Sequence, residues 1–184
     1  MEKNKLGVLL LIGSEAIFFL LLIVAYVSFR NVDTGGPTAV STLDPLLTGV
    51  FSLFLFSSSF TIWRAGKSLM QGQRTAFQGW LLATILLGLV FLAGQAYEWR
   101  SLFAQGATIN TNLFGTTFFT LTGFHGLHVL AGLTALAIIL GMGRAGVDFQ
   151  TAHPAAVESL SLYWHFVDLV WVVIFGVVYV TLLV

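Results

Sequence analysis

Three sets of ionisable side chains lie inside long apolar stretches of the sequence, and these residues could do chemistry. Glu15 is about nine residues into the first apolar stretch. His125 and His128 are three residues apart, as are His165 and Asp168, and this spacing places each pair on one helical face. An ionisable group inside a membrane costs at least about 2.5 kcal/mol, so each set needs a polar partner or a function.

The pair His125 and His128 permits two interpretations. Two imidazoles on one helical face can bind zinc or heme iron. Histidines in a membrane bundle also hydrogen-bond to neighbouring helices, and no nearby carboxylate offers a third ligand. We favour the hydrogen bond, and we expect no metal and no catalytic residue in this chain.

Glu15 and His165 are predicted to lie at similar depths, with His125 and His128 deeper. We therefore predict a hydrogen bond or ion pair between Glu15 and His165, across the first and fifth helices. The structural interpretation is that this pair fixes helix packing. The functional interpretation is proton handling, because burial favours the neutral form of a carboxyl group.

Other polar residues at membrane depth are expected to support packing. Asp168 can bind His165 or a group on another helix, and Tyr163 and Trp164 belong to the same cluster. Glu98 stands beside aromatic residues typical of the membrane interface, so we predict an interfacial structural role for it. Glycines at positions 123, 126 and 132 should let another helix approach closely.

The composition explains why these groups matter. Of 184 residues, 57% are hydrophobic and 9% are charged, against about 25% charged residues in soluble domains. The net charge is zero without a basic cluster, which excludes a nucleic-acid-binding protein. The chain has no cysteine, which excludes disulfides and thiolate metal sites. The first apolar stretch exceeds the 7–15 residues of a signal peptide, so we expect a membrane helix there.

A membrane helix needs roughly 20 mostly apolar residues, and five stretches meet this requirement. We predict an all-α, polytopic membrane helix bundle that forms a single membrane domain over residues 1–184. The five expected transmembrane helices span residues 6–29, 46–63, 77–99, 113–140 and 159–183.

Positive charge predicts the orientation of the bundle, because Lys and Arg favour the cytoplasmic side. Most basic residues fall on the N-terminal side of the membrane: Lys3, Lys5, Arg64, Lys67, Arg74 and Arg144. Only Arg30 and Arg100 fall on the other side. We therefore expect the N-terminus inside the cell and the C-terminus outside.

Several motifs resemble one known family, subunit III of cytochrome c oxidases and related quinol oxidases. They occur in the family's order, and with the segment 95–99 they cover essentially the whole chain. The motifs are Gly13-Ser-Glu-Ala-Ile-Phe-Phe19, Leu69-Met-Gln-Gly72, Phe114-Gly-Thr-Thr-Phe-Phe119 continuing to Thr122-Gly-Phe-His-Gly-Leu-His128, and Tyr163-Trp-His-Phe-Val-Asp-Leu-Val-Trp171.

The resemblance implies an accessory, non-catalytic subunit of a bacterial inner-membrane oxidase that reduces dioxygen to water and pumps protons. Glu15 would correspond to the family's buried helix carboxylate, and the three histidines and Asp168 would match intramembrane positions that bind no metal. Hemes and copper would reside in subunits I and II. This chain would pack against subunit I, bind phospholipid and support proton uptake, with cytochrome c or quinol as the electron donor.

Two departures from the family limit what the resemblance implies. Seven-helix relatives carry two further helices before the one that corresponds to the helix of Glu15, so their lipid cleft does not transfer intact unless another subunit supplies that pair. Mitochondrial-type members have histidines and an acid after the second helix, where this chain has Gly66, Lys67 and Gln71. We expect no proton-collecting surface there.

Two other classes of protein remain as alternatives. An autonomous proton transporter would use Glu15 and His165 as a relay, but the sequence shows no internal repeat and no proline inside a predicted helix. A membrane redox enzyme would bind heme or metal through His125 and His128. Heme absorbance of the isolated chain would distinguish that enzyme from an accessory subunit.

Overall fold

A computed structural model describes residues 3–30, 32, 35–149 and 154–182, and its regular elements there are all helices. Five of these helices are long and apolar enough to cross a membrane. They are α1 (Lys3–Phe29), α3 (Pro45–Met70), α4 (Arg74–Ala104), α5 (Leu113–Arg144) and α6 (Pro154–Val178). Two short elements, α2 (Ala39–Thr42) and the 3-10 helix η1 (Val180–Leu182), complete the chain. The predicted all-α bundle with five transmembrane helices is confirmed.

The helices extend beyond the predicted apolar stretches. α3 continues seven residues past position 63, through Arg64 and Lys67, before it ends at Met70. The Arg64 guanidinium lies 5.3 Å from the centre of the Trp80 ring, and the Lys67 ammonium lies 5.6 Å from the centre of the Trp63 ring. Because long basic side chains cover aromatic rings while their charged ends reach the polar surface, these charges do not end the helix.

Two side-chain caps fix where helices begin. Asp44 accepts hydrogen bonds from the backbone N–H groups of Leu46 and Leu47 at 3.1 and 3.0 Å, and so starts α3. Asn112 accepts from the N–H of Gly115 at 2.8 Å at the start of α5. The Asn112 amide also donates to the carbonyl of Pro37 at 2.7 Å, which ties the loop after α1 to the start of α5.

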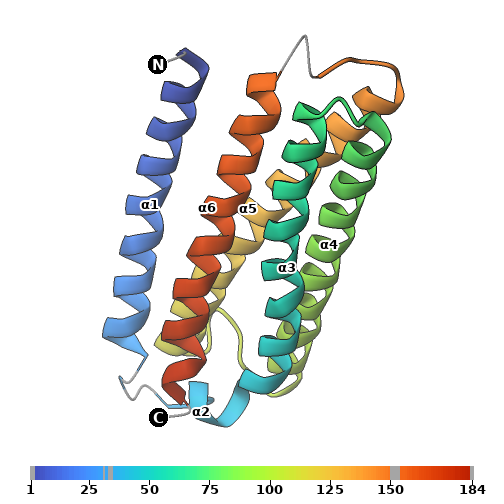
Figure 1. Cartoon of the computed structure of the whole chain (residues 1–184). Helices are drawn as coiled ribbons and strands as arrows, with labels where there is room; N and C mark the ends of the chain where they lie inside the picture. Colours follow the sequence, from blue (N-terminus) through green and yellow to red (C-terminus); the bar gives the residue numbers. More distant parts are fainter. Residues whose placement is uncertain (1–2, 31, 33–34, 150–153, 183–184) are drawn as a thin grey trace.

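α6 lies at the centre of the bundle and packs against α1, α3 and α5 (Figure 1). α3 and α4 form a tight hairpin, and α4 also packs against α5. Among the long helices, α1 packs mainly against α5 and α6. Only 6% of the residues in its most apolar segment are buried inside the described part of the chain. The two ends of the chain lie at opposite ends of the bundle (Figure 1), as five crossings require.

Glycines in α4 and α5 make room for tryptophan rings in the core. A Cβ atom at Gly132 would lie 2.8 Å from the ring of Trp164, and one at Gly88 would lie 3.1 Å from the same ring. Gly123 similarly faces Trp99, at 3.2 Å. Gly132 and Gly123 therefore make space for tryptophan side chains of neighbouring helices. The sequence predicted only that another helix would approach these glycines closely.

Candidate functional site: polar pairs at membrane depth

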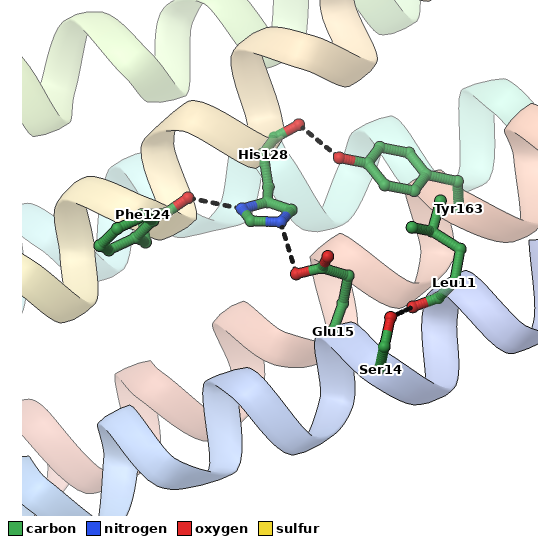
Figure 2. Close-up of polar contacts among 6 residues, drawn as sticks. All are labelled: Leu11, Ser14, Glu15, Phe124, His128 and Tyr163. Atoms are coloured by element: carbon green, nitrogen blue, oxygen red, sulfur yellow. Dashed lines mark hydrogen bonds and ion pairs between the residues drawn. The ribbon is translucent and has the colours of Figure 1, made fainter.

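Glu15 on α1 and His128 on α5 form a polar pair near the middle of the bundle. His128 Nε2 and Glu15 Oε2 are 3.1 Å apart, and their side chains are 18% and 27% exposed. On its other side, His128 Nδ1 lies 2.7 Å from the carbonyl oxygen of Phe124 (Figure 2). The Tyr163 hydroxyl donates to the carbonyl of His128 itself at 3.1 Å, so α6 supports the pair.

This geometry places a proton on one ring nitrogen of His128 and leaves two possible forms at the other. A carbonyl oxygen only accepts hydrogen bonds, so His128 Nδ1 carries a proton and donates it to Phe124. His128 Nε2 then either accepts a hydrogen bond from a neutral Glu15 carboxyl group or, in the imidazolium form, donates one to the carboxylate. In either form, one hydrogen bond between Nε2 and Oε2 joins α5 to α1.

The predicted partner of Glu15 was wrong. Glu15 binds His128, whereas His165 binds Ser59 on α3 at 3.1 Å. Residues two apart on a helix point about 200° away from each other, and Tyr163 faces α5. His165 therefore points away from that side of α6, toward α3. Similar depth in the membrane does not define the direction in which a side chain points.

His165 and Asp168 are joined through the hydroxyl group of Ser59. Ser59 donates to Asp168 Oδ2, and so its single proton is used. His165 Nδ1 must therefore donate to the Ser59 oxygen. The predicted alternative in which Asp168 binds a group on another helix is confirmed.

The order of these three groups differs from that of a catalytic triad. In a catalytic triad the histidine lies between the serine and the acid, so that it can remove the serine proton. Here Ser59 lies between His165 and Asp168. The cluster is therefore a hydrogen-bonded link between α3 and α6. The second oxygen of Asp168, Oδ1, is buried without a hydrogen-bond partner among the described residues.

His125 occupies an aromatic cage rather than a ligand site. Its side chain is 1% exposed and stacks on Trp171, with the two ring centres 4.9 Å apart. Phe91 and Phe19 lie 6.0 and 6.3 Å away, edge-on. His125 and His128 therefore serve different surroundings despite sharing a helical face. In the described part of the chain, no three His, Asp or Glu residues are grouped so that they could hold a metal ion.

Glu98 is a buried polar group, as expected for the polar residues at membrane depth, and only 6% of it is exposed. Its carboxylate accepts hydrogen bonds from Thr48 at 2.7 Å, from Gln95 at 3.0 Å and from Tyr179 at 2.7 Å. Thr48 of α3, Gln95 of α4 and Tyr179, just after the end of α6, thus meet at one carboxyl group. The signal that could have indicated this was Gln95, which is three residues away on the same face.

The sequence interpretation also missed a row of serines on α3. Trp164 Nε1 donates to Ser58 at 2.9 Å, and Trp171 Nε1 donates to Ser52 at 2.8 Å. Indole N–H groups need acceptors when buried, and here the acceptors are hydroxyls on the facing helix. The many serines of α3 therefore fix the position of α6.

Together these contacts define a class of protein: a multi-pass membrane bundle whose titratable groups hydrogen-bond mainly to one another and to hydroxyls, and so hold its helices together. The chain belongs to the cytochrome c oxidase subunit III family, because the model of that family matches residues 1–181. The family resemblance inferred from the motifs is confirmed. The chain is accordingly subunit III of a terminal oxidase in aerobic respiration, and it works beside other subunits of that complex.

Bacterial relatives resemble the chain along most of its length. It is 39% identical to cytochrome c oxidase subunit 3 of Synechocystis sp., over 97% of this chain and 76% of the relative. It is 37% identical to the probable cytochrome c oxidase subunit 3 of Mycobacterium tuberculosis, over 95% of this chain and 86% of the relative. The subunit 3 of Bacillus subtilis is also 37% identical, over 96% of this chain and 86% of its own length.

Proposed function

We propose that this chain is the non-catalytic third subunit of a cytochrome c oxidase in a bacterial cytoplasmic membrane. Subunits I and II would carry the hemes and copper, and this chain would pack against subunit I and sustain its turnover. The observation that carries the proposal is the match of the subunit III family to residues 1–181. The Glu15–His128 pair agrees with it, because both ring nitrogens of His128 already have hydrogen-bond partners. The names of the relatives favour cytochrome c over quinol as the electron donor.

Bound phospholipid is the second part of the proposal. An apolar groove of about 530 Å³ runs between α4 and α5, and its lining includes Trp99, Phe124 and Leu127. Pockets of about 300–1,000 Å³ with apolar walls suit ligands of comparable character. The glycines at positions 123 and 126 deepen this groove on the α5 side. A lipid acyl chain fits such a surface, which lies between two membrane-spanning helices.

Co-purification tests the proposed role. We expect this chain, tagged and extracted in mild detergent, to carry a large subunit with heme and copper, and to show no heme band after separation from it. Glu15→Gln should leave the heme spectrum of the complex intact but weaken retention of the chain or shorten sustained turnover. The exposed Glu158 provides a matched control, and Glu158→Gln should change neither. Recovery without a large subunit, or heme in the isolated chain, would refute the proposal.

The proposed orientation places the N-terminus inside the cell. Arg74 pairs with Asp148 at 2.8 Å at the same end of the bundle as the other inner basic residues, which supports a shared inner surface. Because the chain has no cysteine, single cysteines can report the side. A membrane-impermeant maleimide should label Asn110→Cys in intact cells, and Gln71→Cys only after lysis. The reverse pattern would invert the orientation.

A further inference from the structure

His165 leaves one ring nitrogen unpaired near the middle of the membrane. Its Nδ1 donates to Ser59, and Nε2 has no hydrogen-bond partner among the residues that the structure describes. The side chain is half-buried and lies 11 residues from Pro154 and 13 from Val178, about 16 and 20 Å along α6. Lipid headgroups are too far away to reach it. An unpaired polar atom surrounded by hydrocarbon is costly, so a polar group should cover it.

The unpaired nitrogen is an acceptor. Because Nδ1 carries the ring proton of the neutral imidazole, Nε2 presents a lone pair. Lipid acyl chains offer no hydrogen-bond donor. The Glu15–His128 pair differs in this respect, since both nitrogens of His128 find partners inside the chain. Of the three histidines at membrane depth, His128 has partners for both ring nitrogens, and both nitrogens of His125 are buried inside the described part of the chain without one. Nε2 of the half-buried His165 is therefore the unpaired histidine nitrogen that a group outside the chain can reach.

The surface around His165 is shaped for a helix. His165 belongs to a stripe of α6 whose larger side chains, Leu169 and Val172, are exposed. α6 itself runs between α1 and α3 in the view of Figure 1. The stripe consists of Ser161, His165, Leu169, Val172 and Gly176, at spacings of four, four, three and four residues. Leu169 is 62% exposed, and a Cβ atom at Gly176 would meet nothing within 4 Å. Small residues at the two ends of a stripe let a second helix approach closely.

We propose that this stripe of α6 is the docking surface for a transmembrane helix of the oxidase's large subunit, and that a hydrogen-bond donor on that helix binds His165 Nε2. The donor is a hydroxyl, amide or indole group at the depth of His165. This inference rests on the proposed function, because it names the surface through which the chain joins its complex. Asp168, with its buried and unpartnered Oδ1, lies directly behind the contact and holds Ser59 and His165 in place.

Photo-cross-linking in the whole complex tests the surface. Benzoylphenylalanine in place of Leu169 should cross-link to the large subunit. The same group in place of Leu86, which is 54% exposed on α4, is the matched control and should give no such product. Cross-links from position 86 alone, or from position 169 to a second copy of this chain, would show that the stripe is not the docking surface. Co-purification of the complex would still support the proposed function in that case. If the unmodified chain brought down no large subunit, both proposals would fail.

Two variants of His165 test the hydrogen bond itself. His165→Leu removes the acceptor, and should weaken retention of the chain by a factor of about 3 to about 18, as for one hydrogen bond between membrane helices. His165→Gln keeps an acceptor oxygen and should retain the chain within about threefold of the unmodified complex. Equal losses in the two variants, or no loss in either, would show that Nε2 accepts no bond from the partner.

Discussion

Glu15 and His128 should be energetically coupled, and Glu15 and His165 should not. Polar contacts between membrane helices contribute about 0.6 kcal/mol on average and up to about 1.7 kcal/mol. The 3.1 Å contact is partly sheltered, with both side chains less than one-third exposed, so we expect a coupling energy within that range. Substitutions at residues that do not touch are additive within about 0.5 kcal/mol, which is the limit expected for Glu15 with His165.

A double-mutant cycle measures this difference. Glu15→Ala, His128→Ala, His165→Ala and the two double variants would be unfolded reversibly in mixed micelles with increasing sodium dodecyl sulfate. The fluorescence of the five tryptophans reports the transition. Glu158→Ala combined with His128→Ala controls for general loss of stability and should be additive. A coupling for Glu15 with His165 as large as that with His128, or none for His128, would refute the pairing.

Two further predictions concern the core. Gly132→Ala should lower the free energy of unfolding by about 1–3 kcal/mol in the same assay, because its Cβ would lie 2.8 Å from Trp164. Gly141→Ala, on the same helix with open space, should be neutral or stabilising, and equal losses would contradict the packing argument. Glu98→Ala should cost several kcal/mol, at about 1–3 kcal/mol for each buried group left unsatisfied. Tyr179→Phe should cost only about 0.5–1.5 kcal/mol, and a larger loss than for Glu98→Ala would show that the carboxyl group does not organise the cluster.

The sequence was sufficient to predict the helices because the bilayer imposes their length. Runs of about 20 apolar residues have no other stable form in a membrane, so the five helices and the all-α class followed directly. The ends were less certain. Arg64 and Lys67 looked like a loop, but their side chains lie over aromatic rings, and α3 continues through both.

The partners of polar residues were harder to predict, because depth and rotation are separate coordinates. Counting residues gives the depth of Glu15, but the helix that faces it depends on how α1, α5 and α6 rotate about their axes. The contact between Tyr163 and His128 contains that information, and it becomes visible only in three dimensions. The partners of Glu98 were not predicted for a similar reason, because Thr48 in α3 and Tyr179, just after the end of α6, are distant in sequence.

The sparse packing of α1 also has a consequence during synthesis. α1 emerges from the ribosome before α5 and α6, yet it packs against both, and the partner of Glu15 lies 113 residues further along the chain. At about 5–20 residues per second, that interval lasts about 6–23 s. During this time Glu15 sits on a membrane-inserted helix without His128. The carboxyl group therefore lacks its hydrogen-bond partner within this chain until the fourth membrane-spanning helix is made.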